Sequence, residues 1–276
     1  MSFRFPLPTQ LFLIVVFTTL SAYRLVQLRP QLFSIWAVLM LYMVLLQESS
    51  RRDLWALGGV ACLSAAWANI HAGFVLGPIF IAAALTSMLC LALVSTGSPR
   101  RRALHRARHL SLLLLIAVLA SCLNPGGPAQ FFLYFDAGEA TAALSQVGDE
   151  WAVFPFSGWP GGNFPPTPAA WTIAMLIFFL TPPIVAVESF RRIQNARSRG
   201  DESEESASFP TIDPGLLAIA AASLFAMATA VRFLWLGGFP LGVIAIAVRR
   251  TSAQKELISL SRRLIAALSA CVLLVA

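Results

Sequence analysis

Charged residues are scarce in this sequence. Only 12% of the 276 residues are Asp, Glu, Lys or Arg, whereas a soluble domain has about 25%. A water-soluble globule in which 58% of the residues are hydrophobic would lack the polar side chains to cover its surface. Together with the mean hydropathy of +0.75, this excludes an ordinary soluble domain and indicates that lipid is the solvent for much of the chain.

Common catalytic and metal-binding motifs are also absent. The sequence has no P-loop, GxGxxG, HExxH or GxSxG pattern, which excludes the usual soluble nucleotide-binding, zinc-protease and serine-hydrolase sites. The four cysteines lie inside apolar runs and form no CxxC pair. This favours small core residues over disulfides or metal ligands.

Long apolar runs dominate the sequence instead. Only helices and closed barrels cross a bilayer, because every backbone N–H and C=O must be bonded internally, and unbroken runs favour helices. We therefore expect an all-α integral membrane protein, a polytopic bundle of about nine transmembrane helices that forms a single transmembrane domain over residues 1–276. The expected spans are Phe5–Tyr23, Gln31–Leu46, Leu54–Ile70, Gly73–Leu93, Leu110–Leu123, Pro168–Val187, Gly215–Val231, Phe233–Val248 and Leu264–Ala276.

The basic residues orient these spans. With a cytoplasmic N-terminus, seventeen of the 20 Lys and Arg residues fall on the inner side, and only Arg24, Arg29 and Arg232 remain outside. This asymmetry is what the positive-inside rule predicts. The net charge of +7 is therefore interpreted as cytoplasmic anchors near anionic lipid headgroups, so that we expect membrane lipids as partners and no nucleic acid.

Two connections are long. The outer loop, residues 124–167, is rich in Gly, Pro and aromatic residues and contains four acids but no Lys or Arg; loops of this length are usually functional or disordered. We expect it to fold down onto the membrane surface. The inner connection, residues 188–213, carries an acidic run and is expected to be a flexible cytoplasmic linker. Because apolar runs start near Met1 and continue to Ala276, we expect part of a longer module or a shortened family member.

Polar side chains at membrane depth are costly and mark functional sites. Asn69 and His71 occupy the expected turn between the third and fourth spans. A histidine there can bind a metal, accept a proton or donate to a phosphate; alternatively, the two residues cap helix ends. Asp149 and Glu150 are adjacent carboxylates in the outer loop, suited to act as a general base or to share a cation, the alternative being solvated loop acids.

The three arginines on the outer side form a further group. A guanidinium matches phosphate oxygens in a bidentate way, so Arg24, Arg29 and Arg232 predict a lipid phosphate or pyrophosphate as partner. The alternative is that they extend to outer-leaflet headgroups. The Asn124-Pro125-Gly126-Gly127 segment, in contrast, has mainly the chemistry of a turn.

Five short motifs occur in a fixed order. They are Arg29–Ser34 (RPQLFS), Trp67–Phe74 (WANIHAGF), Leu123–Gly126 (LNPG), Asp149–Trp151 (DEW) and Val231–Phe233 (VRF). Their order and their placement on one membrane face resemble bacterial multi-spanning proteins that are similar to GT-C glycosyltransferases, over roughly Leu20 to Leu241. The resemblance implies transfer of a sugar from a polyprenyl-phosphate donor on the extracytoplasmic face of the bacterial cytoplasmic (inner) membrane.

The resemblance also implies roles for the candidate residues. Glu150 or Asp149 would be the catalytic carboxylate, and Arg29, Arg232 and Arg24 would contact the lipid phosphate. Asn69 and His71 would bind the donor or a divalent cation, for which His71 and Glu150 are the candidate ligands.

The chain departs from the GT-C pattern in two places. The first outer loop, Tyr23–Pro30, has no acidic residue, and Ala72 stands where a glycine is expected. Two other functions therefore stay open: a non-catalytic membrane subunit or scaffold whose outer loop docks a partner subunit, and a lipid or solute transporter. A transporter would need charged or helix-breaking residues at mid-membrane, where Gly77-Pro78 and Pro182-Pro183 are the best candidates.

Overall fold

The described part of the chain is all-helical. The computed structural model describes residues 6–25, 30–46, 53–132, 152–158, 166–198 and 212–253, and these residues contain no strand. Within them, four helices are long and apolar enough to cross a membrane: Ala72–Val94, Gly97–Ser121, Pro168–Glu188 and Val231–Val248. The expected all-α architecture is confirmed for these residues, and the four long apolar helices are typical of a membrane protein.

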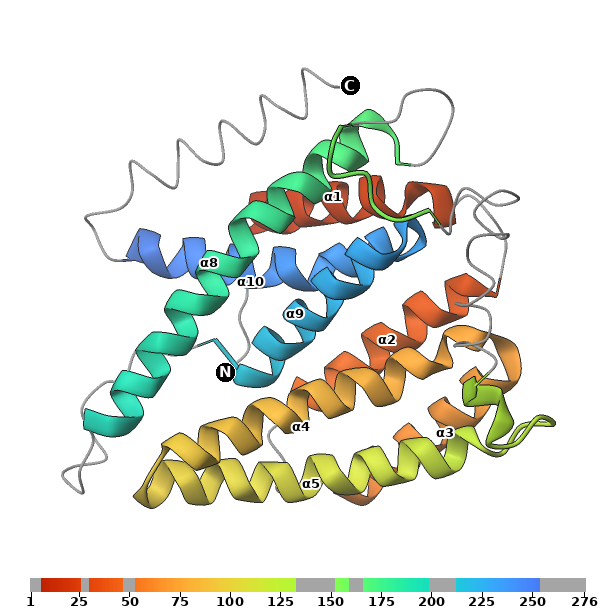
Figure 1. Ribbon diagram of the computed structural model, residues 1–276, viewed down its shortest axis with the longest axis horizontal. Helices are drawn as coiled ribbons and strands as arrows, with labels where there is room; N and C mark the ends of the chain where they lie inside the picture. Colours follow the sequence, from red (N-terminus) through yellow and green to blue (C-terminus); the bar gives the residue numbers. More distant parts are fainter. Residues whose placement is uncertain are drawn as a thin grey trace. The chain divides into compact units, whose positions relative to one another are not determined.

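The helices follow the apolar runs of the sequence. In chain order they are α1 (Leu7–Leu25), α2 (Gln31–Leu46), α3 (Asp53–Ile70), the 3-10 helix η1 (Ala72–Val75), α4 (Leu76–Val94), α5 (Gly97–Ser121), α8 (Pro168–Ser198), α9 (Pro214–Thr229), the 3-10 helix η3 (Val231–Gly237) and α10 (Gly238–Ala253) (Figure 1). Eight of the nine predicted spans coincide with these helices. The ninth, from Leu264, lies outside the described residues.

Two helices are longer than predicted. Helix α5 begins at Gly97 rather than at Leu110, because Ala103, Ala107 and Leu110 recur at helical spacing and are buried, which makes the arginine-rich segment amphipathic. Helix α8 runs on to Ser198, so the first part of the predicted flexible linker, residues 188–198, is helical. That part contains no glycine or proline to stop the helix.

The chain divides into two compact units. Unit 1 comprises Met1–Val26, Leu144–Glu188 and Ser223–Ala276, and unit 2 comprises Gln27–Ala143 and Ser189–Ala222. Unit 1 therefore contains α1, most of α8, the second half of α9, η3 and α10. Unit 2 contains α2, α3, η1, α4, α5 and the first half of α9.

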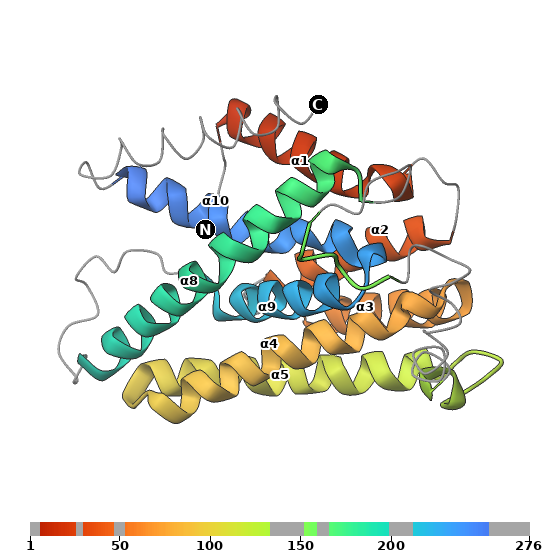
Figure 2. The same ribbon diagram turned by 45° about the horizontal axis from the view of Figure 1, so that its top comes forward.

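Unit 2 is built around a long hairpin. Helices α4 and α5 run side by side and antiparallel, as both views show (Figures 1 and 2), while α3 packs on α5 and α2 packs on α3 and α4. Alanines are buried along both hairpin helices, at Ala84 and Ala92 in α4 and at Ala103 and Ala107 in α5. Small side chains let helix backbones approach closely, which is how helices associate in an apolar solvent.

Unit 1 depends on a close approach at Gly237. Helix η3 packs against α1 and α10. A Cβ atom placed on Gly237 would lie 2.9 Å from Leu20 Cδ1 and 3.3 Å from both Ile177 Cδ1 and Met227 Cε. A glycine is therefore needed where side chains of α1, α8 and α9 meet the end of η3.

An ion pair in unit 2 joins α5 to the start of α9. Asp213 caps α9, because its Oδ1 accepts hydrogen bonds from the backbone N–H of Gly215 (2.7 Å) and Leu216 (3.2 Å). Its other oxygen, Oδ2, pairs with Arg106 of α5. Arg106 also donates from Nη2 to the carbonyl of Leu45 near the end of α2 (3.0 Å). The guanidinium of Arg106 thus bonds a group at the start of α9 and another near the end of α2.

We predict that Asp213→Ala destabilises the protein more than Asp213→Asn. Asparagine caps a helix about as well as aspartate, whereas loss of an N-cap costs about 1 kcal/mol. Asp213→Asn should therefore lose only the ion pair, and Asp213→Ala should lose a further 1 kcal/mol or so in free energy of unfolding. Denaturant unfolding in detergent, followed by circular dichroism, measures both.

The matched control is the same pair of substitutions in an Arg106→Gln background. There Asp213→Asn should have little further effect, because the ion pair is already gone. Equal destabilisation by the asparagine and alanine variants would contradict the capping role of Asp213.

Candidate functional site

The turn at His71, in unit 2, reverses the chain between α3 and α4. Helix α3 ends at Ile70, and His71 is extended (φ −154°, ψ 136°) before η1 begins. The Nδ1 atom of His71 accepts a hydrogen bond from the backbone N–H of Gly73 (3.0 Å). The imidazole therefore caps η1, as predicted for the structural alternative, and the turn predicted at residues 69–73 is confirmed.

A buried hydrogen-bond network fixes the ring of His71. Ser34 Oγ, from the first turn of α2, lies 2.8 Å from His71 Nδ1, and the indole Nε1–H of Trp67 donates to Ser34 Oγ (2.7 Å). Because the Gly73 N–H can only donate, Nδ1 must be an acceptor, and the hydroxyl of Ser34 donates to it. The neutral imidazole consequently carries its proton on Nε2.

Gly73 is required by this network. A Cβ atom at position 73 would lie 2.7 Å from His71 Nδ1 and 2.9 Å from Ser34 Oγ, distances too short for any side chain. The neighbouring Ala72 is exposed, so its methyl group fits although a glycine was expected there. The glycine that the geometry needs is therefore the one at position 73.

Asn69 joins α3 to α5. Its Nδ2 donates to the carbonyl of Ala65 (2.8 Å) in its own helix and to the carbonyl of Leu123 (2.8 Å) beyond the end of α5. Leu123 leads into a turn in which Asn124 Oδ1 accepts the N–H of Gly126 (2.8 Å) and Gly127 has φ +55°. The amide of Asn69 is thus used to satisfy helix ends, as the structural alternative predicts.

The turn at Arg232, in unit 1, has a similar backbone but a different cap. Helix α9 ends at Thr229, Ala230 is extended (φ −158°, ψ 138°), and η3 follows without a side-chain cap. Instead, residues of the outer loop bond to the turn. Val231 N–H donates to the carbonyl of Ala152 (2.9 Å), and Phe154 N–H donates to the carbonyl of Ala228 (3.3 Å).

Aromatic side chains hold this loop segment, residues 152–158, on unit 1. Phe154 is buried and lies 5.0 Å from Phe156 and 5.1 Å from Phe178 of α8, measured between ring centroids. The indole Nε1–H of Trp171 donates to the carbonyl of Pro155 (2.8 Å). Such contacts stabilise an aromatic cluster by about 1 kcal/mol per pair beyond burial. The segment is therefore fixed against both α8 and the Arg232 turn.

Arg232 itself is half-buried in η3. Its guanidinium carbon lies 5.4 Å from the ring centroid of Phe233, within the range of a cation–π interaction. The residue that precedes Arg232 is Val231, the one bound by Ala152. Arg232 is thus the next residue after the one that hydrogen-bonds to the docked loop segment.

The other predicted site residues divide between the units or lie outside the description. His71 and Asn69 belong to unit 2, and Arg232 belongs to unit 1. Arg24 lies in α1, but its side chain is outside the described part, as are the whole residues Arg29, Asp149 and Glu150. Two contributors were missed by sequence reasoning: Ser34 and Trp67. A serine within the apolar run of α2, in the RPQLFS motif, was the signal for the first.

The role of Trp67 was not predicted, because its residue type suggested a different one. Tryptophan near a helix end is typical of the membrane interface, but Trp67 is only 1% exposed and uses its N–H within unit 2. In the described residues, no group of three or more His, Cys, Asp or Glu side chains is placed to hold a metal ion. Glu150, one of the two candidate ligands, lies outside those residues.

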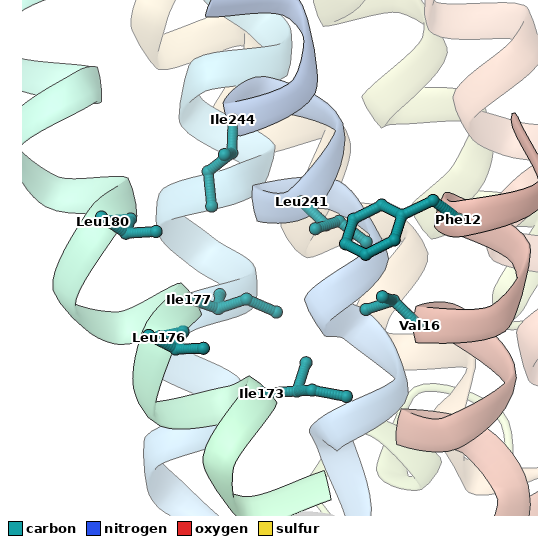
Figure 3. A pocket seen from close by; sticks show the side chains of 8 residues that line it. All are labelled: Phe12, Val16, Ile173, Leu176, Ile177, Leu180, Leu241 and Ile244. Atoms are coloured by element: carbon teal, nitrogen blue, oxygen red, sulfur yellow. The ribbon is translucent and has the colours of Figure 1, made fainter. Parts of the chain in front are cut away.

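A small cavity in unit 1 is entirely apolar. It is lined by side chains of α1, α8 and α10, among them Phe12, Ile177 and Leu241 (Figure 3), and its volume is about 20 Å³. This is scarcely more than the space for one water molecule, and the lining offers no hydrogen-bonding side chain. The cavity is therefore a packing defect between helices and not a site for a sugar.

Comparison with protein-family models, with curated proteins and with solved structures found no match for this chain.

We predict that Gly73→Ala lowers thermal stability. The added methyl group would displace Ser34 or His71 and leave buried polar atoms unbonded, at a cost of about 1–3 kcal/mol. A fall in the midpoint of thermal unfolding, measured in detergent, is the expected result.

Gly58→Ala is the matched control. Position 58 lies in α3 with nothing within 4 Å of an added Cβ, and alanine favours a helix over glycine by about 1 kcal/mol. The control should keep or raise the midpoint. A Gly73→Ala midpoint equal to that of the Gly58→Ala control would show that the network around His71 is not tightly packed.

Proposed function

We propose that the chain is a GT-C-like membrane glycosyltransferase, or part of one, that transfers a sugar from a polyprenyl-phosphate donor on the extracytoplasmic face. The observation that supports this most directly is the docking of residues 152–154 on the Arg232 turn within unit 1. The docked segment directly follows the Asp149-Glu150-Trp151 motif. The residues that follow the carboxylate pair in the chain therefore contact the turn that carries the arginine, and this supports a common site for two groups predicted separately from the sequence.

Covalent geometry limits how far these groups can separate. Only Trp151 separates Glu150 from Ala152 in the chain, so the Cα atoms of these two residues lie at most about 7 Å apart. Ala152 is bonded to Val231, which precedes Arg232. A carboxylate and a guanidinium with this linkage can reach the sugar and the phosphate of one donor, since these are adjacent in a glycosyl phosphate.

The proposed reaction assigns one role to each group. The carboxylate of Glu150, or of Asp149, removes the proton from the acceptor hydroxyl, whose oxygen bonds to the anomeric carbon of the donor sugar. The bond from that carbon to the phosphate oxygen breaks, and its electron pair leaves with the polyprenyl phosphate. Arg232 stabilises the growing negative charge on the phosphate by bidentate hydrogen bonding.

The remaining predicted residues keep secondary roles in this proposal. Arg24, in unit 1, is a further phosphate contact. Arg29, His71 and Asn69 belong to unit 2, and their roles at the donor or at a divalent cation stay predictions from the sequence.

The proposed topology has nine transmembrane helices with a cytoplasmic N-terminus, in the bacterial inner membrane. The uneven distribution of Lys and Arg supports it. The antiparallel packing in unit 2 also supports it, because Ser34 meets His71 at one end of the helices, whereas Leu45, Arg106 and Asp213 meet away from that end. This is the alternation that successive spans require.

One observation favours a second function, a non-catalytic subunit whose outer loop docks a partner. Val153 is 64% exposed and Phe156 is 49% exposed on the docked segment. Exposed apolar side chains on a fixed backbone are suited to contact a partner membrane subunit.

We predict that Glu150→Gln and Arg232→Gln each abolish sugar transfer. Loss of a general base costs about 10²- to 10⁴-fold in rate, and loss of the phosphate contact should cost a comparable factor. The measurement is transfer of labelled sugar from polyprenyl-phosphate sugars to acceptors in proteoliposomes.

Arg102→Gln is the control for charge, because it removes an exposed arginine from α5 in unit 2. It should retain wild-type transfer, with all three variants expressed equally. Wild-type rates in both site variants would refute the enzymatic function. If Val153→Asp and Phe156→Asp instead released a co-purifying membrane subunit, the function as a non-catalytic docking subunit would replace the enzymatic one.

A further inference from the structure

The arginine-rich half of α5 is a helix surface and not a loop. It begins at Gly97, and its arginines at positions 100, 101, 102 and 108 are all exposed, while Arg106 is half-buried in its ion pair with Asp213. The buried side of the same segment is formed by alanines against α4. The exposed side is therefore strongly cationic, without an acidic side chain from Gly97 to Ser121.

Two of these arginines continue the apolar stripe of the helix. Leu112, Leu115 and Leu119 are exposed and recur at intervals of three and four residues, which places them on one face of α5. Counting backwards, Arg108 precedes Leu112 by four residues, and Arg101 precedes Arg108 by seven. Arg101 and Arg108 consequently lie on the face that the leucines expose, whereas Arg100 and Arg102 lie to either side of it.

The partner helix shows what surrounds this face. Helix α4 runs antiparallel beside α5 (Figure 1), and its last turns are apolar and exposed, with Leu93 82% exposed and Leu89 44% exposed. Residues near the end of α4 lie opposite residues near the start of α5, because Ser95 and Thr96 alone connect the two helices. Leucines this exposed are suited to a lipid environment, so we expect lipid around this end of the hairpin.

The length of α5 sets the depth of the two arginines. Twenty residues separate Arg101 from Ser121, which corresponds to about 30 Å of helix, the thickness of the hydrocarbon core. Arg101 is therefore expected at the level of the lipid phosphates. Arg108 lies about 10 Å deeper, but helical side chains are directed towards the N-terminus, and a long arginine extends to the headgroups. Both guanidinium groups reach the same layer.

We propose that Arg101 and Arg108 of α5 form a binding site for the headgroup of an anionic phospholipid. The two guanidinium groups bind the phosphate, and Leu112 and Leu115, exposed on the same face of α5, contact the acyl chains. The occupant is a lipid of the surrounding leaflet, because the cationic groups continue a hydrocarbon-facing stripe. This site is separate from the one proposed for sugar transfer and does not depend on it.

The test compares retention of dioleoylphosphatidylglycerol and dioleoylphosphatidylcholine by the full-length protein, using native mass spectrometry. The wild type should retain phosphatidylglycerol in preference to phosphatidylcholine. Arg101→Gln with Arg108→Gln should weaken phosphatidylglycerol binding by about tenfold or more, since each arginine near an anionic surface contributes appreciably. Arg100→Gln with Arg102→Gln removes the same charge from the flanks and should cause a much smaller loss.

A lysine pair, Arg101→Lys with Arg108→Lys, separates charge from folding. It should keep most of the phosphatidylglycerol binding, and all three double variants should unfold at the wild-type temperature in phosphatidylcholine. Equal losses in the stripe and flank variants, or no preference for phosphatidylglycerol in the wild type, would overturn the proposal. Unchanged binding in the stripe variant would also overturn it.

Discussion

The structure depends on the requirement that helix ends in an apolar bundle find hydrogen-bond partners within the protein. The last carbonyls and the first N–H groups of a helix have no partner within the helix itself. Each described turn solves this with a different group. Asp213 caps α9, Asn69 donates to the carbonyl of Leu123 just beyond the end of α5, and His71 caps η1. The few polar side chains of the chain are concentrated at these ends for that reason.

The two units use the same backbone device in different ways. In both, an extended residue, His71 or Ala230, joins an α-helix to a 3-10 helix. In unit 2 the cap is the side chain of the extended residue itself. In unit 1 that residue is alanine, so the cap comes from a separate segment, Ala152–Phe154. A turn that is completed by another part of the chain holds that part in place, so residues 152–154 are fixed on the Arg232 turn.

For a polar residue at a helix end, the structural contacts of its side chain therefore have to be identified before a function is assigned to it. Asn69 is fully explained by the two carbonyls that its amide bonds. The contacts of His71 Nδ1 with Gly73 and Ser34 are likewise structural. Arg232 is related to the site by its neighbours in the chain rather than by its cap.

Much of the fold was predictable because the period and length of apolar runs decide where a membrane helix lies. Eight predicted spans coincide with described helices, of which four are long and apolar enough to cross a membrane, and the turn at His71 was also predicted. The early start of α5 at Gly97 was not predicted, because the buried apolar residues Ala103, Ala107 and Leu110 are interspersed with arginines. The hydrogen bonds of Ser34 and Trp67 at His71 were not predicted either, because partners from different helices cannot be found from one sequence. The docking of Ala152 on Val231 uses only backbone atoms, which carry no sequence signal.

The central claim is that the helices place the His71 turn on one side of a bilayer and the arginines of α5 on the other. It is tested most directly by cysteine labelling in intact cells. In a chain with its four native cysteines replaced, single cysteines are introduced at the exposed positions Ala72 and Ser98. A membrane-impermeant maleimide should label Ala72→Cys in intact cells and Ser98→Cys only after the membrane is permeabilised. Labelling of Ser98→Cys from outside would contradict the account.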